Sequence, residues 1–151
     1  MSDSVTPAGI LAQLGVDLAL VQDPGVSSEW PLYIGTLPDE TVVTSSTSGN
    51  AIGFFSTGGI LQPKDMKGGR TIRPGVQVRS RSSTETNAYE ILHRIANQFA
   101  PITRRNVTLL SSTHEIQNIS QQSDVLPLGK SDDQLHEYSV NFIVTINAFY
   151  T

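Results

Sequence analysis

The sequence predicts a single α+β domain in which a twisted, mostly antiparallel sheet of about five to six strands carries two helices packed on one face. Two segments place apolar residues at helical spacing, and several others alternate apolar and polar residues as half-buried strands do. The length of 151 residues suits one domain. Both helices on the same face of one sheet would bury both apolar stripes together.

The first helix is predicted over residues 7–21. Pro7 suits the first helical position because its missing N–H would be unpaired there in any case, and Thr6 or Ser4 can cap the helix. Asp-Pro-Gly at 23–25 ends it. The apolar stripe consists of Ile10, Leu11, Leu14 and Leu18.

Residues 30–35 and 51–56 are predicted as two short strands. Residues 36–50 between them are rich in Ser and Thr, which indicates a polar loop or a loose hairpin. Residues 60–75 contain two prolines and three glycines without a sustained period, and we expect an extended loop there.

Residues 76–81 alternate apolar and polar side chains and are predicted as a strand. This pattern places Arg79 and Arg81 on one face of the strand and Val76 and Val78 on the other.

The second helix is predicted over residues 83–100. Ser82 followed by Glu85 is a capping-box pattern, and Pro101 stops the helix. The apolar stripe consists of Ala88, Ile91, Leu92, Ile95, Ala96 and Phe99.

Three further strands are predicted at 107–110, 115–121 and 137–149. Residues 126–129 are interpreted as part of the connection that precedes the last strand. One face of that strand is expected to carry Tyr138, Val140, Phe142, Val144, Ile146 and Ala148.

The formal net charge of −4 conceals a segregated pattern, because all ten cations lie between Lys64 and Lys130. Residues 1–63 carry −6, residues 64–105 carry +6 and residues 106–151 carry −4. Such segregation bears on association rather than on fold. A net acidic chain is a poor candidate for a dedicated nucleic-acid-binding protein.

Several kinds of chemistry are excluded or left without a motif. The absence of cysteine excludes a disulfide scaffold, a thiolate zinc site and a cysteine nucleophile. None of the histidines, His93, His114 and His136, stands in a metal-binding or catalytic motif, and no P-loop, nucleophile elbow or dinucleotide fingerprint occurs. We therefore expect no enzyme, no metal site and no cofactor. No secretory leader or membrane-spanning stretch is found, so we expect a soluble protein.

Three sequence blocks together carry a resemblance to a known family. They are Trp-Pro-Leu-Tyr-Ile-Gly-Thr-Leu-Pro-Asp-Glu at 30–40, Thr-Gly-Gly-Ile-Leu-Gln-Pro-Lys-Asp-Met at 57–66 continuing to Arg-Pro-Gly-Val-Gln-Val-Arg at 73–79, and Val-Leu-Pro-Leu-Gly at 125–129. In this combination, residues 1–151 resemble a minor capsid or tail-completion protein of long-tailed bacteriophages, similar to the tail terminators.

The resemblance implies a structural protein of the virion, located at the tail–neck junction and assembled in the host cytoplasm. Tail terminators form a hexameric ring that caps the tail tube, stops its polymerisation and joins the tail to the head–neck connector proteins while leaving a channel for double-stranded DNA. The resemblance implies no cofactor, no contact with a membrane and no small-molecule substrate. The interface loop positions that the resemblance implies are Trp30, Tyr33, Asp39, Glu40, Asp65, Met66, Leu126 and Leu128.

A six-membered ring is consistent with the length of the chain. A compact chain of this size has a radius of gyration of about 15 Å, hence a diameter of about 38 Å as a uniform sphere. Six touching spheres leave a central hole of about one diameter, whereas four leave only about 0.4 of a diameter. A hexamer could therefore surround a DNA duplex, and a tetramer could not.

The basic segment has two possible places in such a ring. It could face the lumen and touch passing phosphates, or it could dock on an acidic patch of a neighbouring subunit or of the next ring. We favour the second arrangement, because tight phosphate contacts would slow a DNA conduit. The residues concerned are Lys64, Lys67, Arg70, Arg73, Arg79 and Arg81.

Two other functions stay open at the level of sequence. A head-completion or connector ring protein (a stopper or adaptor) would share the size and the lack of catalytic motifs. A small nucleic-acid-binding module would use Arg79 and Arg81 with Tyr33 or Phe54 as stacking platforms.

Overall fold

The computed structural model describes residues 6–18, 20, 30, 32–35, 50–60, 69–109, 112–130 and 135–149. In chain order the elements are α1 (Pro7–Asp17), β1 (Leu32–Ile34), β2 (Ala51–Ile60), β3 (Gly69–Ser82), α2 (Glu85–Phe99), β4 (Thr103–Leu109), β5 (Ser112–Gln121), β6 (Leu126–Lys130) and β7 (His136–Phe149).

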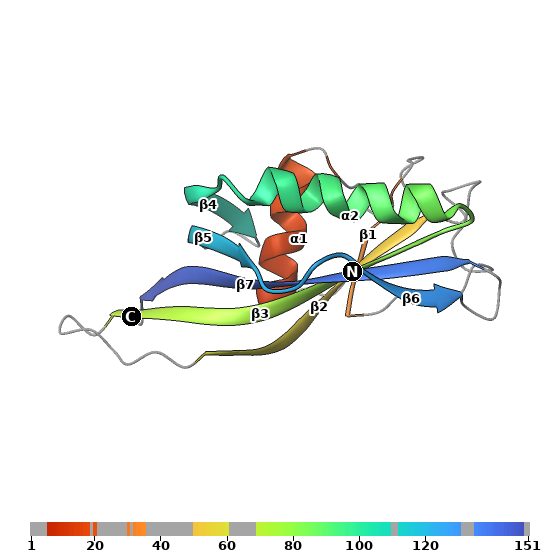
Figure 1. The fold of residues 1–151 in the computed structure, drawn as a ribbon. Helices are drawn as coiled ribbons and strands as arrows, with labels where there is room; N and C mark the ends of the chain where they lie inside the picture. Colours follow the sequence, from red (N-terminus) through yellow and green to blue (C-terminus); the bar gives the residue numbers. More distant parts are fainter. Residues whose placement is uncertain are drawn as a thin grey trace.

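The strands form one seven-stranded sheet with the order β1-β2-β3-β7-β5-β4, and β6 pairs with β7 off this path (Figure 1). Every pair is antiparallel except β1 with β2, which is parallel. The predicted α+β fold with two helices and a mostly antiparallel sheet is confirmed. The sheet has one strand more than expected, because β6 lies in the segment that was interpreted as a connection.

Strand β7 is the centre of the sheet. One of its edges pairs with β3, and its other edge pairs first with β6 and then with β5. The predicted inner face is buried in the core, as Val140, Phe142 and Val144 show. The other face is half-buried at Asn141 and Ile143 but buried at Ser139 and Thr145.

Both helices pack on the same face of the sheet. The Ala8 amide at the start of α1 donates to Ser56 Oγ on β2 (3.2 Å), and Ser80 Oγ on β3 donates to the Ala88 carbonyl of α2 (2.6 Å). Ser56 pairs with Val76, and Val76 lies on the same face of β3 as Ser80. The two hydrogen bonds therefore hold both helices to the same face of the sheet. Helix α1 contacts strands at both ends of the strand order, β1 and β2 at one end and β4 at the other, so the sheet curls around it.

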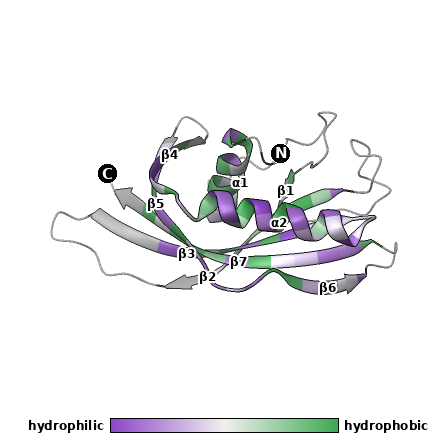
Figure 2. Ribbon diagram, turned by 45° about the horizontal axis from the view of Figure 1, so that its top comes forward, coloured by the Kyte–Doolittle hydropathy of each residue, from purple (hydrophilic) through white to green (hydrophobic). Residues whose placement is uncertain are grey.

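Helix α2 owes its position to its apolar stripe. All six predicted stripe residues are buried, while the residues between them are exposed. The hydropathy colours alternate along α2 in Figure 2, as they do in a helix with one apolar side. The sequence therefore determines which side of α2 meets β3 and β7.

The ends of both helices differ from the prediction. Helix α1 ends at Asp17, and Thr6 caps its start as expected. The capping box at Ser82 is wrong, because Thr84 is the N-cap of α2 and accepts from the Asn87 amide. Strand β3 continues to Ser82, and the buried Ser82 hydroxyl donates to Asn50 Oδ1 (2.6 Å) instead.

The loop predicted over 60–75 is also wrong in part. Residues 69–75 belong to β3, where hydrogen bonding to β7 outweighs the local glycines and proline. Pro74 has no pairing partner in either neighbouring strand, so its missing N–H disturbs no ladder. Residues 61–68 and the predicted polar loop at 36–49 lie outside the described residues.

Candidate assembly surfaces

The six basic residues singled out by the sequence do not form one exposed patch in the described structure. Lys64 and Lys67 lie outside the described residues, as does the side chain of Arg70, whose backbone belongs to β3. Arg73 and Arg79 are half-buried on β3, and Arg81 is buried with 4% of its surface exposed.

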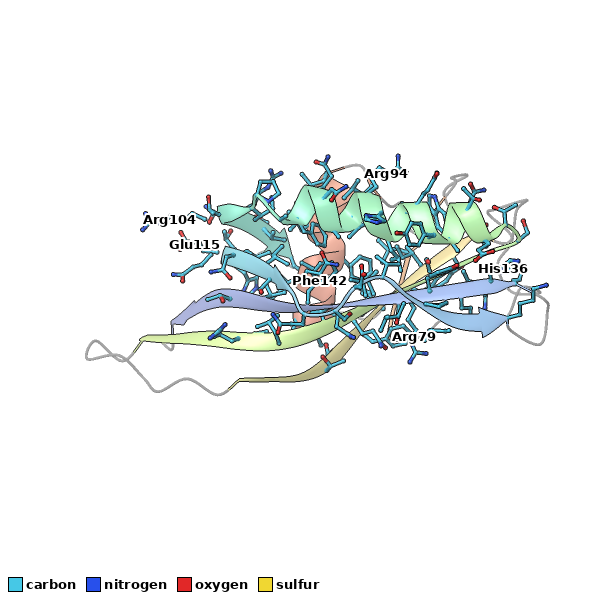
Figure 3. The ribbon with its side chains drawn as sticks, viewed as in Figure 1. Arg79, Arg94, Arg104, Glu115, His136 and Phe142 are labelled. Atoms are coloured by element: carbon cyan, nitrogen blue, oxygen red, sulfur yellow. The ribbon has the colours of Figure 1, made fainter. Side chains whose placement is uncertain are left out.

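Arg79 is the best-defined cation of this group. It lies on the face of β3 opposite Val76 and Val78, as predicted, and projects from the side of the sheet away from α2 (Figure 3). Its Nε donates to Gln77 Oε1 (2.9 Å), and its guanidinium lies 5.0 Å from the centre of the Phe55 ring. These contacts hold the charge at a fixed place on the open face of the sheet.

The predicted interface positions divide into core and surface residues. Trp30 is buried in the hydrophobic core, and Tyr33 on β1 is half-buried. Leu126 and Leu128 on β6 are the most exposed large hydrophobic side chains of the described residues, at 46% and 47%. Asp39, Glu40, Asp65 and Met66 lie outside the described residues.

The stacking platform considered for a nucleic-acid-binding module is partly wrong. Phe54 is fully buried in the core between the sheet and the helices, so its ring cannot stack on a base. The strand pattern alone did not reveal which of the two adjacent phenylalanines, Phe54 or Phe55, faces inward.

An aromatic cluster that the sequence did not predict joins α2 to the start of β7. The Tyr138 hydroxyl donates to Glu85 Oε1 (2.6 Å). The Tyr89 ring packs edge-on against both Tyr138, at 5.7 Å between centroids, and His93, at 4.8 Å. The spacing of Tyr89 and His93, one helical turn apart, was the sole signal of this cluster in the sequence.

The hydrogen bond from Tyr138 to Glu85 raises the pKa of the Tyr138 phenol, and burial and the negative charge of Glu85 act in the same direction. The neutral phenol is therefore the form that the fold stabilises. This bond ties the first turn of α2 to β7.

The aromatic cluster continues into the exposed strand β6. Pro127 on β6 pairs directly with Tyr138, and Tyr138 in turn contacts Tyr89, which is 38% exposed. Leu126 pairs with Ser139, and Ser139 pairs with Arg79 on its other side, so the Leu126 side chain lies on the open face of the sheet, away from Tyr89 and Tyr138. The exposed large hydrophobic side chains of the described residues are therefore divided between the two faces of the sheet.

The described residues offer neither a metal site nor a membrane-spanning helix. They include no group of three or more His, Asp or Glu side chains that could hold a metal ion. They also include no helix that is long and apolar enough to span a membrane.

A family model described as bacteriophage tail terminator protein matches residues 11–148. The match spans every strand of the sheet and both helices, except the first turn of α1 and the last residue of β7. No curated protein sequence matches the chain closely enough to count as a relative.

Proposed function

The chain belongs to the bacteriophage tail terminator family, a family of structural phage proteins, and from this premise we propose that six copies form a ring that caps the tail tube. The ring stops further addition of tube subunits and joins the tail to the connector proteins of the neck. DNA passes through its central channel. The ring assembles in the host cytoplasm and stays in the virion at the tail–neck junction.

The observation that carries this proposal is the match of the family model over residues 11–148. The exposed side chains of Leu126 and Leu128 on β6 add physical support, because a protein that works by assembly needs apolar surface that its own core does not cover. A connector ring would need such a surface too, so the difference lies in which structure the ring meets.

The basic segment is assigned to contacts between proteins rather than to DNA. Arg79 is held by Gln77 and Phe55, and Arg81 is buried, so neither side chain extends freely toward a phosphate. Replacing Lys64, Lys67, Arg70 and Arg73 together by Glu should prevent ring formation or head joining. Infectious particles with intact rings from that variant would contradict this assignment.

The direct experiment mixes the purified chain with growing tail tubes and observes them by electron microscopy. We expect a six-fold ring at one tube end and an end to tube growth, while tubes without the protein keep elongating. Rings that bind heads and never tubes would identify a connector protein instead. Salt-dependent binding to DNA by single subunits, without rings, would favour the nucleic-acid-binding module.

A further inference from the structure

One row of residues crosses five strands on the open face of the sheet, opposite both helices. The register of neighbouring strands places these residues side by side, in the order Tyr33 on β1, Gly53 on β2, Arg79 on β3, Ser139 on β7 and Leu126 on β6. We call these five residues the cross-strand row. Tyr33 and Arg79 are half-buried, and Leu126 is exposed. Because Gly53 and Ser139 are small, the three large side chains are the ones that a partner would meet.

The cross-strand row takes one residue from each of the three sequence blocks that carry the resemblance. Tyr33 belongs to the block at 30–40, Arg79 to the block that ends at 79, and Leu126 to the block at 125–129. Strand pairing brings these three positions, all predicted to take part in contacts, onto one face. Tyrosine and arginine are also among the residue types that contribute most to binding energy between proteins. The row is therefore the best candidate for the centre of a docking surface.

Arg79 is held in place before any partner binds. Its Nε donates to Gln77 Oε1 (2.9 Å), and its guanidinium lies 5.0 Å from the centre of the Phe55 ring, which is also on the open face. An arginine held in this way loses little conformational freedom when its remaining N–H groups bind a carboxylate. The chemistry at the centre of the row therefore favours an acidic protein segment.

The acidic side chains described on this part of the sheet are engaged elsewhere or lie far from Arg79. Glu137 pairs in register with the buried Arg81, and the Asp124 carboxylate accepts from a backbone amide next to it (3.0 Å). Glu115 lies beside the far end of β7, about 26 Å along the strand from the row. The charge of Arg79 is therefore left for a carboxylate from another part of the assembly.

The chain itself contains carboxylates that no cation accompanies in the sequence. Residues 1–63 carry a charge of −6 and include no cation. Asp39 and Glu40 stand side by side in the same sequence block as Tyr33, with apolar Leu37 and Val42 close to them. We call residues 37–42 the acidic stretch. It combines negative charge with apolar side chains, as the cross-strand row combines a cation with a tyrosine and a leucine.

We propose that the cross-strand row binds the acidic stretch of a second copy of this chain. Arg79 pairs with the partner subunit's Asp39 or Glu40, while Tyr33 and Leu126 cover the apolar side chains of the same stretch. Because the two contacting surfaces differ, the contact is head-to-tail and repeats around a closed ring. This inference rests on the proposed ring and names the residues that join its subunits.

The first test reverses the charge at the centre of the row. Arg79→Glu should stay monomeric at concentrations where the unchanged chain forms rings, as measured by light scattering and electron microscopy. Arg94→Glu is the matched control, because it makes the same change of charge at an exposed position of α2, on the other side of the sheet. Leu126→Ser changes a side chain that is 46% exposed, so it should fold normally and raise the concentration needed for rings about tenfold. Circular dichroism checks the fold of each variant.

The second test restores the pair with its charges exchanged. A chain with Asp39→Arg and Glu40→Arg should also fail to form rings. Mixing that chain with Arg79→Glu should restore rings, because every contact then joins opposite charges on two subunits. Rings that return only when all three substitutions are made in one chain would place the contact within a subunit and overturn the inference. The absence of rings from both the mixture and the combined chain would overturn it as well.

The behaviour of the unchanged chain separates this inference from the proposed function. If Arg79→Glu and Leu126→Ser form rings as readily as the unchanged chain, the inference fails while the function stands. If Arg79→Glu forms rings that no longer cap tail tubes, the row binds the tube and the inference also fails. If the unchanged chain neither forms rings nor caps tubes, the proposed function itself fails.

Discussion

The two halves of β7 face different surroundings. In its middle, Phe142 and Val144 are buried beneath the helices, and the neighbouring strand β5 is itself paired with β4. At its start, β7 pairs with β6, whose residues are all exposed. Because Tyr138, Ser139 and Val140 in the first half of β7 are buried too, the difference lies in the neighbouring strand, which carries buried residues in β5 and none in β6. The difference indicates that the fold does not need the leucines of β6, which leaves them available for assembly.

The largest effect is expected from removing the aromatic ring at the centre of the buried half. Phe142 packs edge-on against Phe99, with 5.6 Å between the ring centroids, and is almost fully buried. Phe142→Ala should lower the free energy of unfolding by about 3–5 kcal/mol, because it leaves a cavity that the core cannot fill. Urea denaturation measures this loss. A loss below about 1 kcal/mol would mean that the half of β7 beside β5 contributes no more to the free energy of unfolding than the half beside β6.

A smaller loss is expected where β2 and β3 approach closely. A methyl group at Gly75 would touch Thr57 Oγ1 and lie 2.6 Å from the Gly58 carbonyl oxygen. Gly75→Ala should therefore cost about 1–3 kcal/mol through forced backbone movement. Gly58→Ala is the control, since it meets nothing within 4 Å. Equal melting temperatures for the two variants would contradict the close approach.

The bond between Tyr138 and Glu85 lies in the half of β7 that pairs with β6. Tyr138→Phe should cost about 1 kcal/mol through loss of one hydrogen bond. Because the pKa of Tyr138 is raised above its ordinary value of 10.0, the phenol contributes stability below that pH, and this contribution is lost as pH rises through the folded-state pKa. Unfolding curves from pH 8 to pH 11 should therefore show a steeper alkaline loss for the unchanged chain than for the variant. Parallel pH profiles would argue against this bond.

The smallest effect is expected on β6. Leu126→Ala and Leu128→Ala should each change the free energy of unfolding of the isolated subunit by no more than about 0.5 kcal/mol, because both side chains are already exposed. The measurement is made by urea denaturation at a concentration below that of assembly. A loss close to that of Phe142→Ala would show that β6 is part of the core.

Much of the buried half could be predicted from local patterns. The alternation along 137–149 and the six-residue stripe of the second helix predicted buried faces that the structure confirms. Strand β6 was missed because Leu-Pro-Leu-Gly is locally typical of a turn, and it becomes a strand through pairing with β7. The cap of α2 was misplaced because the buried Asn50 recruits the Ser82 hydroxyl from 32 residues away, a contact that no local pattern contains.

The candidate surface was predictable only in part. The resemblance carried by Val-Leu-Pro-Leu-Gly at 125–129 pointed to Leu126 and Leu128, and both are exposed. Trp30 was singled out in the same way but lies in the core. The contacts among Tyr89, Tyr138 and Glu85 depend on where α2 crosses the start of β7. That crossing is set by packing between segments far apart in the chain.

The sequence by itself determined the fold class, the inward faces of the second helix and of β7, and the segregation of charge along the chain, because these follow from periodicity and composition. The tertiary structure alone decided that β6 exists and that Phe54 points inward while Arg79 is anchored outward. The physical reason is that strand pairing and helix docking join residues far apart in the chain, so surfaces form from neighbours that no local pattern specifies.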